Sequence, residues 1–585
     1  MIHVTINDRD IEVKEGSTIL EAARQAGEEI PTLCHIEELF PSGACRMCVV
    51  EVEGRPGLVP SCSFPATEGM RIRTNSPRVM NARRTILELL LASHPFDCLT
   101  CNRNGRCELQ DLAAQYNIEQ VPFKGKTRHH YTDLSSPAIV RDPDKCILCG
   151  RCVRVCEEIQ GVSAIDFMHR GFDTTVLPAF NKDLSETACV NCGQCTLACP
   201  TGALHEVSHV ERVMRVIQEG KKYVVAQTAP AIRFALGEFY GMNPGANVTG
   251  RMPAALRRIG VKKVFDTDFT ADLTIMEEGT ELLQRLASGG KMPLPMFTSC
   301  CPAWIKFAEH NFPELLPNIS SCKSPQQMMG SLIKTYLAEK EGLNPADIFV
   351  VSVMPCTAKK YEATRPELGR NGQPDVDAVL TTREFARMID LFGINFASLP
   401  EEEFDLLLGQ TSGSGDVFAA SGGVMESALR TAYNLITGED LEEIDFRSVR
   451  GFEGLKEAEV EIAGQKIKVA VVNTLGKTRE LIKRIQAGEA DYAFVEVMAC
   501  PGGCVGGGGQ IYGFDWERTK ARLRSVYEIE KSRRIRLSYK NEQIQALYSD
   551  YLEKPGSHLS HSLLHTKYRT RGERKVNKVK EEINA

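Results

Sequence analysis

Four cysteines in the second half of the sequence lie in three separated segments, each of which follows a short apolar run. They are Cys301, Cys356, Cys500 and Cys504. Apolar runs of this length are typical of buried strands, and open α/β sheets bind their ligands at the carboxyl ends of such strands. Four thiolates that converge there would form a cage for a soft metal centre.

A fifth cysteine, Cys300, stands directly before Cys301. Two adjacent cysteines rarely both reach one cluster, so we expect Cys300 to be a free thiol beside the metal, where it can take part in chemistry. Pro302 occupies a plausible first position of a helix. Such a helix would direct its amide groups and the positive end of its dipole at the thiolates of Cys300 and Cys301.

The first cysteine set of the N-terminal half is Cys34, Cys45, Cys48 and Cys62. It follows an alternating hairpin pattern and a capping-box pair, Thr18 and Glu21, that predicts a helix ending near Gly27. Plant-type 2Fe–2S domains have a shorter first gap between their cysteines, so we interpret this set as a longer-looped 2Fe–2S relative. The alternative is a zinc site, which usually uses paired C-x2-C units.

The second set combines one histidine with three cysteines: His94, Cys98, Cys101 and Cys107. By its spacing alone this donor set fits zinc and a 4Fe–4S cube about equally well. The neighbouring cysteine sets favour iron.

The third and fourth sets form an internal repeat with the spacing of bacterial ferredoxins, in which the fourth cysteine of each run binds the other cluster. One 4Fe–4S cluster is therefore expected on Cys146, Cys149, Cys152 and Cys199. The other is expected on Cys189, Cys192, Cys195 and Cys156. Because no substrate-binding motif accompanies these sets, we interpret residues 1–210 as an electron-transfer region that carries single electrons to a buried site.

The 585 residues are too many for one core and predict several domains. The 21 cysteines fall mostly in short-spaced sets, which favours metal binding over disulfides in so large a chain. A net charge of −6 gives no reason to expect nucleic acid or an anionic membrane as a partner. Neither a secretory signal nor an apolar stretch long enough to span a membrane is visible, so we expect a cytoplasmic protein.

From about residue 220, apolar runs alternate with helical patterns such as Thr382–Phe392 and Gly423–Leu435, as expected when helices cover a parallel sheet. The predicted strands are Tyr223–Ala226, Val261–Phe265, Met296–Phe297, Phe349–Val353, Val469–Val472 and Ala493–Val497. The predicted fold class is an α/β catalytic domain with parallel sheets, preceded by α+β ferredoxin-like iron–sulfur domains and followed by a short helical tail.

Glu278 and Glu281 lie three apart on one face of a predicted helix, and Arg285 follows Glu281 by four residues. Such a pattern usually marks a solvated charged face. The alternative is a proton path, in which buried carboxylates would have raised pKa values and pass protons stepwise.

Two glycine-rich stretches, 409–415 and 506–509, lack the sequence context of nucleotide-binding loops. We expect the second stretch to let the backbone approach a metal cluster closely. Cys322 belongs to no cysteine set and is expected to be a small buried residue. The basic stretch from Lys567 to Lys580 is interpreted as a solvated or docking tail.

Three segments of the second half closely resemble the signatures of the iron-only (FeFe) hydrogenases. They are Thr298-Ser-Cys-Cys-Pro302, Met354-Pro-Cys-Thr-Ala-Lys-Lys-Tyr-Glu362 and Glu496-x-Met-Ala-Cys-x3-Cys504-x-Gly-Gly-Gly. The resemblance extends from the first ferredoxin-like domain to His558 and His565, and includes all five cysteine sets in order. It points to the large multi-cluster form, similar to the catalytic subunits of NAD(P)-linked iron hydrogenases, and it favours iron at His94.

The resemblance implies an active-site cluster in which a 4Fe–4S cube is joined to a two-iron unit that carries CO, cyanide and a bridging dithiolate. Cys301, Cys356, Cys500 and Cys504 match the ligands of the cube, and Cys504 also matches the bridge between the two parts. Lys359 matches a residue that donates a charge-assisted hydrogen bond to a cyanide. Further matches line the pocket: Met354, Met498, Gln326, Ser324 and Pro230.

One position departs from the family pattern, because Ala231 stands where some members have a serine that bonds the other cyanide. We expect this change to alter cluster tuning more than turnover. The resemblance also implies a proton path from Cys300 through Glu278, Ser320 and Glu281 to Arg285.

The resemblance implies one 2Fe–2S cluster, three accessory 4Fe–4S clusters and the active-site cluster, acting in reversible H2 oxidation and proton reduction. The expected electron partner is a ferredoxin, a flavin-containing NAD(P)H-oxidising subunit or a formate dehydrogenase, and maturation proteins insert the two-iron unit. The expected domains are 1–78 (2Fe–2S, β-grasp), 79–120 (His/Cys3 4Fe–4S), 138–210 (double 4Fe–4S ferredoxin-like), 220–515 (catalytic) and 516–585 (C-terminal helical segment).

Two other functions fit parts of the sequence. Residues 1–210 also resemble the iron–sulfur subunit of respiratory NADH dehydrogenase and of some formate dehydrogenases, which would make the chain an electron relay, but the catalytic half argues against that role. A sensory or cluster-assembly relative would keep the cluster cysteines without rapid turnover. Intact Cys300, Lys359, Met354 and Met498 argue against this second alternative.

Overall fold

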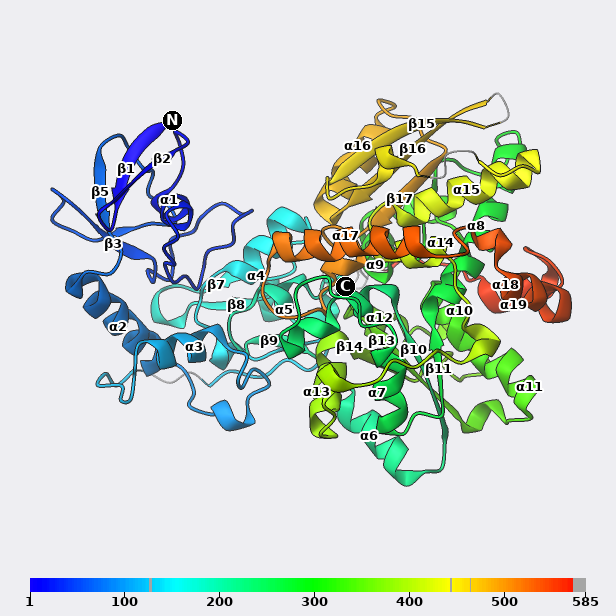
Figure 1. The fold of residues 1–585 in the computed structure, drawn as a ribbon, viewed down its shortest axis with the longest axis horizontal. Coiled ribbons are helices and arrows are strands. Elements are labelled where there is room, and N and C mark those ends of the chain that lie inside the picture. Colours follow the sequence, from blue (N-terminus) through cyan, green and yellow to red (C-terminus); the bar gives the residue numbers. More distant parts are fainter. Residues whose placement is uncertain (126–128, 442–444, 463–464, 572–585) are drawn as a thin grey trace, which may run out of the picture.

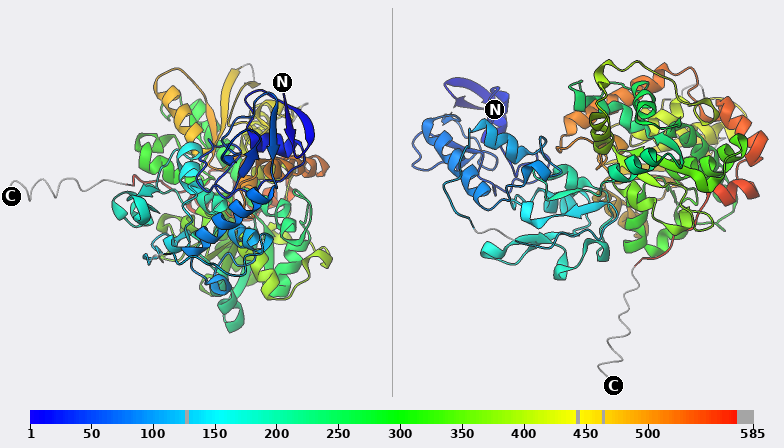
Figure 2. Two further views of the ribbon diagram at one scale, coloured as in Figure 1. Left: turned by 90° about the vertical axis from the view of Figure 1, so that its left-hand side faces the viewer. Right: turned by 90° about the horizontal axis from the view of Figure 1, so that it is seen from below.

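The computed structural model describes residues 1–125, 129–441, 445–462 and 465–571. The N-terminal iron–sulfur region projects to one side of a larger α/β body, on which the C-terminal helices lie (Figure 1; Figure 2 gives two further views). No helix within these ranges combines the length and apolarity that a membrane crossing requires.

The N-terminal region begins with a five-stranded sheet in the order β2-β1-β5-β3-β4. The predicted hairpin and capped helix are confirmed: β1 pairs antiparallel with β2, and Thr18 and Glu21 form the capping box of α1. The elements are β1 (Ile2–Ile6), β2 (Arg9–Val13), α1 (Ile19–Gln25), β3 (Val49–Val52), β4 (Val59–Pro60) and β5 (Met70–Arg73). The four cysteines of the first set lie in the loops after α1, before β3 and after β4.

The next region is built from short elements around its cysteines. These are α2 (Pro77–Ala92), α3 (Glu108–Gln115), α4 (Arg151–Arg154), α5 (Gln194–Ala198) and the strand pairs β6 (Ile139–Arg141) with β9 (Leu204–Glu206) and β7 (Asp166–Met168) with β8 (Thr175–Leu177). The two ferredoxin-type runs fold alike: α4 and α5 each start after a left-handed glycine, Gly150 (φ 72°) and Gly193 (φ 73°). A side chain at Gly193 would overlap Thr357, so this turn packs closely on the catalytic region.

Two four-stranded sheets form the region that was predicted to be catalytic. The first, in the order β11-β10-β13-β14, is entirely parallel, and the second, β12-β17-β16-β15, is parallel except for the antiparallel edge strand β15. The strands are β10 (Tyr223–Thr228), β11 (Lys263–Asp266), β12 (Met296–Phe297), β13 (Ile348–Met354), β14 (Ala378–Thr381), β15 (Leu455–Ile462), β16 (Gln465–Asn473) and β17 (Phe494–Met498). All six predicted strands are present, whereas β14 and β15 were not predicted.

Helices pack around both sheets. They are α6 (Val210–Glu219), α7 (Arg251–Ile259), α8 (Thr267–Ala287), α9 (Pro302–Asn311), α10 (Pro325–Leu332), α11 (Ala338–Glu341), α12 (Ala358–Glu362), α13 (Thr382–Leu391), α14 (Gly413–Asp416), α15 (Gly423–Thr437) and α16 (Leu475–Gln486). The predicted helices at α13 and α15 are confirmed, and α9 begins at Pro302 with Cys301 at its N-cap, as expected. The first turn of α9 therefore lies directly beside the cysteine pair.

The C-terminal segment consists of α17 (Trp516–Ser532), α18 (Glu542–Leu547) and α19 (His558–Leu564). Helix α17, orange in Figure 1, runs across the catalytic body. The start of the basic stretch packs on that body, since Arg571 forms an ion pair of 2.6 Å with the buried Glu309. Residues 572–580 of the stretch lie outside the described residues.

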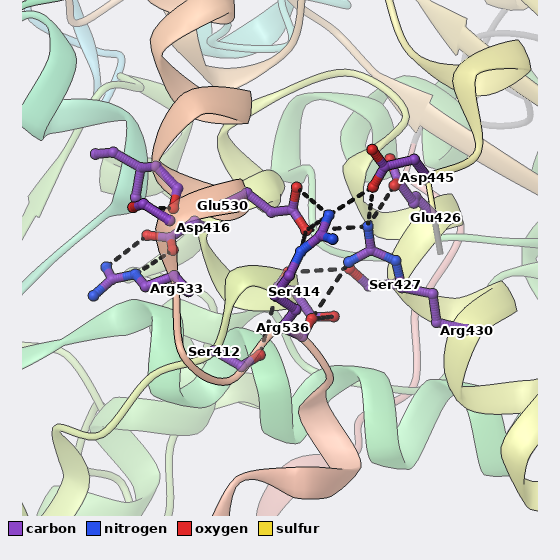
Figure 3. A network of polar contacts seen from close by, with 12 residues as sticks. Ser412, Ser414, Asp416, Glu426, Ser427, Arg430, Asp445, Glu530, Arg533 and Arg536 are labelled. Carbon is purple, nitrogen blue, oxygen red and sulfur yellow. Dashed lines mark hydrogen bonds and ion pairs between the residues drawn. The ribbon is translucent and has the colours of Figure 1, made fainter. Parts of the chain in front are cut away.

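A network of arginines and carboxylates fastens α17 to the catalytic body (Figure 3). Glu530 of α17 is fully buried and accepts hydrogen bonds from Arg430 of α15 at 3.2 Å, from Arg450 at 3.3 Å and from Arg536 at 2.8 Å. Nearby, Arg533 donates to the buried Asp416 at 2.6 Å. Such buried charges are stable only while each has its partner.

Replacing Glu530 by alanine is expected to destabilise the protein by about 3–5 kcal/mol, because it leaves buried guanidinium groups without their shared carboxylate. Thermal unfolding of the variant should start at a lower temperature, and limited proteolysis should cut first near α17. The matched control is Glu517→Ala on the same helix; the Glu517 side chain is 78 % exposed and, among the described residues, forms an ion pair with Lys520 alone. The control should lower the free energy of unfolding by no more than about 1 kcal/mol. Equal losses of stability in both variants would contradict a structural role for the network.

Candidate active site and candidate metal centres

The three cysteine-bearing segments of the catalytic region end at one cavity. Strands β12, β13 and β17 lead directly into the loops that carry Cys301, Cys356, Cys500 and Cys504, and all four residues line one cavity. Parallel strands that end at the same edge of their sheets explain why residues up to two hundred positions apart meet. The predicted convergence of the four cysteines is what the structure shows.

The donor set of this cavity fits a metal cluster. Burial, and then the nearness of the other thiols, raises the pKa of Cys356 and of Cys504 to about 12. Burial likewise raises the pKa of Cys301, and that of Cys500 well above its ordinary value. Four thiolates at this depth would repel one another unless a cation neutralised them, and a soft metal assembly supplies that charge.

Most residues that were expected to surround the cluster line the same cavity. Pro230, Gln326, Met354 and Met498 do so, whereas Ser324 is not among the lining residues and instead donates a hydrogen bond to Glu362. Thr267 and Phe418 also line the cavity and were not predicted. Thr267 directly follows β11, so its place at the end of a strand was a usable signal; no pattern in the sequence marked Phe418.

Glu362 connects the expected pocket residues and was not proposed as one of them. Its carboxylate accepts from Ser324 Oγ at 2.9 Å, from Gln326 Nε2 at 2.9 Å and from Lys359 Nζ at 3.0 Å. Lys359 also donates to the Cys300 carbonyl at 3.1 Å. Although burial lowers the pKa of Lys359, the Glu362 charge outweighs it, so the ammonium stays charged at the cavity wall. That wall can bind an anionic ligand of a metal.

Cys300 lines the cavity beside the four expected ligands. Burial raises the pKa of its thiol well above the ordinary value, and the nearby Glu278 carboxylate raises it further. The thiol is therefore protonated at neutral pH. It stands between the cavity and α8.

The helix face with Glu278, Glu281 and Arg285 is buried, which excludes the solvated-face interpretation. These side chains belong to residues only 1 %, 8 % and 4 % exposed. Arg285 binds Glu281 Oε1 at 2.6 Å, and Ser320 Oγ donates to Glu281 Oε2 at 3.4 Å. Neither Glu278 oxygen has a hydrogen-bond partner among the described residues. An unpartnered buried carboxyl between Cys300 and Ser320 suits a proton carrier.

Burial raises the pKa of Glu278 to about 8 from an ordinary value of 4.5, and the Glu281 charge contributes. The nearby Ser320 hydroxyl, which does not reach hydrogen-bonding geometry, opposes this shift only in part. Glu278 is therefore protonated at neutral pH. It can give a proton to one neighbour and take one from another.

This shift predicts a pH-dependent stability. Because the pKa of Glu278 is higher in the folded protein than in the unfolded chain, its stability contribution is complete below about pH 4.5 and is lost as the pH rises to about 8. The change is at most about 1.4 kcal/mol per pH unit. A Glu278→Gln variant lacks this pH-dependent contribution. The difference between its melting temperature and that of the wild type should therefore rise between pH 5 and 8 and then stay constant. A difference that does not vary with pH would contradict the raised pKa.

The four cysteines of the first set are buried and lie within contact of one another. Hydrogen bonds from Cys45 and Cys62 lower the pKa of Cys34, and a hydrogen bond from Cys62 lowers the pKa of Cys48 to about 7. Backbone amides also point at the sulfur atoms, from Leu33 to Cys45 at 3.4 Å and from Cys45 to Cys34 at 3.5 Å. Amide groups directed at thiolates are typical of iron–sulfur sites.

The two ferredoxin-type runs cross over as expected. One cavity is lined by Cys146, Cys149, Cys152 and Cys199. The pKa values of Cys192 and Cys195 are raised well above the ordinary value by burial and then by nearby thiols that include Cys156 and Cys189, so the second set gathers separately. The nearby Cys356 also raises the pKa of Cys192, which places the second set beside the candidate active site.

The His94 set converges less completely. His94, Cys98 and Cys107 line one cavity, whereas Cys101 is not among its lining residues and faces Gly202, where a side chain would lie 2.7 Å from its sulfur. The Nδ1 atom of His94 is buried without a partner among the described residues, and burial lowers the pKa of the ring. A neutral imidazole with an unpaired nitrogen is suited to bind a metal.

Glycines 506–509 allow close contact with cysteine-bearing loops. A side chain at Gly508 would lie 2.2 Å from the Cys192 carbonyl, and one at Gly507 would lie 2.2 Å from the Pro355 carbonyl. The glycine run therefore packs the second ferredoxin-type set against the loop of the candidate active site. Cys322 is fully buried, as expected.

Comparison with known proteins agrees with this arrangement. Residues 222–508 match the family described as iron only hydrogenase large subunit, C-terminal domain, and residues 517–571 match iron hydrogenase small subunit. Residues 1–77 match a 2Fe-2S iron-sulfur cluster binding domain, 83–122 the NADH-ubiquinone oxidoreductase-G iron-sulfur binding region, and 116–203 a 4Fe-4S dicluster domain.

Two curated relatives align over almost their whole length. The chain is 50 % identical over 578 residues to the NADP-reducing hydrogenase subunit HndD of Solidesulfovibrio fructosivorans, with 97 % of this chain and 99 % of the relative covered. It is 42 % identical over 573 residues to iron hydrogenase 1 of Clostridium pasteurianum, with the same coverage. A solved structure of apo [FeFe]-hydrogenase HydA1 from Chlamydomonas reinhardtii covers 63 % of this chain and 100 % of its own, at 43 % identity and a TM-score of 0.57. The chain belongs to the iron-only hydrogenase family and is an oxidoreductase of that family.

Proposed function

We propose that this protein catalyses reversible H2 oxidation and proton reduction at a 4Fe–4S cube joined to a two-iron unit, held by Cys301, Cys356, Cys500 and Cys504. The observation that carries the proposal is the buried cavity in which these four thiols meet a fifth, Cys300. A cluster of this kind supplies the open metal position at which H2 is split or formed. The cavity wall is largely apolar, which keeps water away from that position.

The chain's own residues hold and move the proton. The Cys300 thiol exchanges it with the cluster side, and Glu278, protonated at neutral pH, exchanges it with Cys300. Ser320 and Glu281 continue the path toward Arg285, whose guanidinium holds Glu281 in place. Each transfer joins groups of the types that serve as general acids and bases.

Lys359 has a different task, which is to hold negative charge at the cavity wall. Its ammonium, kept charged by Glu362, is suited to bind a cyanide of the two-iron unit. Pro230, Gln326, Met354 and Met498 shape the remaining wall, with Ser324 supporting Gln326 through Glu362. Ala231 is buried beside Pro230 and offers no hydroxyl to a second cyanide.

Electrons follow a separate route through four accessory centres. We propose a 2Fe–2S cluster in domain 1–78, a His/Cys3 4Fe–4S cluster in 79–120 and two 4Fe–4S clusters in 138–210, which lead to the catalytic domain 220–515. The placement of Cys192 beside Cys356 supports the last transfer. The segment 516–585 is proposed as a fused small-subunit-like cover.

The electron partner is proposed from the relatives. One relative is named as a subunit of an NADP-reducing hydrogenase, so we propose that this chain is the catalytic subunit of a cytoplasmic complex that couples H2 to NAD(P), to ferredoxin or to both. A flavin-containing NAD(P)H-oxidising subunit or a formate dehydrogenase would dock on the N-terminal clusters. Maturation proteins are required to insert the two-iron unit.

The test is anaerobic production together with those maturation proteins. Infrared bands of CO and cyanide would report the two-iron unit, and a viologen-linked assay would report H2 turnover. Protein that carried iron–sulfur clusters but neither bands nor turnover would refute the proposal and favour an electron-relay or cluster-assembly role. Purification of the untagged complex from its native cell would identify the electron partner.

A further inference from the structure

A second group of buried polar side chains lies beside Glu281 and comes from the C-terminal segment. The residues after α19 pair with the segment that carries Ser321, since the Lys323 amide donates to the Leu564 carbonyl at 2.7 Å and the Thr566 amide donates to the Ser321 carbonyl at 2.8 Å. This pairing brings His565 beside the proposed proton path. The His565 side chain is only 4 % exposed.

One nitrogen of His565 is held by a carboxylate. Nε2 lies 3.0 Å from Glu277 Oε2. Although burial raises the pKa of Glu277, hydrogen bonds from His565, Ser560 and Tyr548 outweigh it and lower that pKa below its ordinary value. Glu277 is therefore ionised, and Nε2 of His565 carries a hydrogen and donates it to this carboxylate.

The other nitrogen of His565 reaches Glu281 through one hydroxyl. Nδ1 lies 2.8 Å from Ser321 Oγ, and the same oxygen lies 2.8 Å from Glu281 Oε2. Arg285 binds the opposite oxygen, Oε1, so Oε2 is left for the serines. The three groups form a continuous row within hydrogen-bonding distance.

A serine hydroxyl has one hydrogen, so the two contacts of Ser321 allow two arrangements. If Ser321 donates to Glu281, then Nδ1 must donate to Ser321 and His565 is an imidazolium. If Ser321 donates to His565, then Glu281 must carry a hydrogen and donate it to Ser321. The two arrangements differ by one proton moved from His565 to Glu281.

We propose that His565 and Ser321 form a second branch of the proton path, which joins it at Glu281. In the transfer, the proton on His565 Nδ1 moves to Ser321 Oγ while the hydroxyl proton of Ser321 moves to Glu281 Oε2. This leaves a neutral imidazole and a neutral carboxyl, and no electron is transferred. Proton release during H2 oxidation runs the same steps in reverse.

His561, one helical turn before His565, is exposed, and the two rings stack with centroids 4.6 Å apart and planes within 4°. Stacked faces form no hydrogen bond, so exchange between His565 and solvent would run through water at the edge of the rings, at the surface of α19. The inference rests on the proposed function, because a branch at Glu281 matters only if that path serves H2 turnover.

The experiment compares Ser321→Ala and His565→Gln in fully matured protein. The glutamine amide can occupy the position of Nε2 and keep the bond to Glu277, but it cannot exchange a proton. We expect H2 evolution and oxidation to fall about threefold to tenfold in both variants, less than the roughly 10²- to 10⁴-fold loss typical when a group that transfers the proton directly is removed. The solvent deuterium isotope effect on turnover should rise, while the CO and cyanide bands stay unchanged.

The matched control is Tyr548→Phe. It removes the hydrogen bond of 2.6 Å that the Tyr548 hydroxyl donates to Glu277, but it leaves the row of His565, Ser321 and Glu281 intact. It should keep the turnover and the isotope effect of the wild type. Wild-type turnover in Ser321→Ala would overturn the branch, as would an equal loss in Tyr548→Phe with no change in the isotope effect. If His565→Gln fails to fold, Ser321→Ala decides alone. Absence of turnover in the matured wild type would instead overturn the proposed function, and the branch with it.

Discussion

Replacing Cys300 by alanine is expected to reduce H2 turnover by about 10²- to 10⁴-fold, because this thiol lines the cavity and is proposed to carry the proton between the cavity and Glu278. Alanine cannot hold a proton, and the largely apolar wall disfavours a water molecule in place of the thiol. The cluster ligands are untouched, so the CO and cyanide bands should remain. The viologen-linked assay measures H2 turnover and infrared spectroscopy measures the CO and cyanide bands, both on one preparation.

The control for this variant is Cys322→Ala. It deletes another buried thiol of the same region. Cys322 belongs to no cysteine set, and its sulfur lies 4.0 Å from His565 Nδ1 but is not a member of the proposed path from Cys300 to Glu281. Turnover should stay close to that of the wild type. If Cys300→Ala kept full activity, Cys300 would not be a proton carrier.

Replacing Cys504 by alanine is expected to abolish H2 turnover together with the CO and cyanide bands. Cys504 lines the cavity with the other three expected ligands and is proposed to join the cube to the two-iron unit. Its loss would remove a ligand of both parts, and ligand thiolates cannot be replaced by an apolar side chain. Electron paramagnetic resonance of the reduced protein should still show the accessory clusters, since their cysteines lie in residues 34–199.

The two cysteine variants therefore lose activity for different reasons, and the infrared spectrum separates them. Cys300→Ala should be an inactive protein with a complete cluster, whereas Cys504→Ala should lack the two-iron unit. Bands that survived in Cys504→Ala would show that this cysteine does not bridge the two parts. Bands lost in Cys300→Ala would show that Cys300 is a ligand rather than a proton carrier.

The sequence was informative where ligands sit close together along the chain. The ferredoxin-type runs and the segment from Cys500 to Cys504 carry their donors within a few residues, so their spacing alone predicts the coordination chemistry. Apolar runs located six strands of the catalytic region because a strand covered on both faces needs apolar side chains on both. The edge strand β15 was not predicted, because its apolar pattern is interrupted by Lys456, Glu457, Glu459 and Glu461.

The tertiary structure decided the properties that depend on neighbours distant in the chain. The sequence pattern of Glu278 and Glu281 is typical of a solvated helix face, but in the structure both residues of α8 are buried. This burial raises the pKa of Glu278. Glu362 belongs to the site through its contacts with Lys359 and Ser324, which no pattern in the sequence indicates.

The amino-acid sequence by itself thus determined which donor atoms this protein offers to metals, because cysteine spacing is a local property of loops. Only the tertiary structure decided that Glu278 is neutral, that Glu362 holds Lys359 at the cavity wall, and that His565 lies close to Glu281. Desolvation and hydrogen bonding depend on every group packed around a side chain, and most of those groups come from elsewhere in the chain.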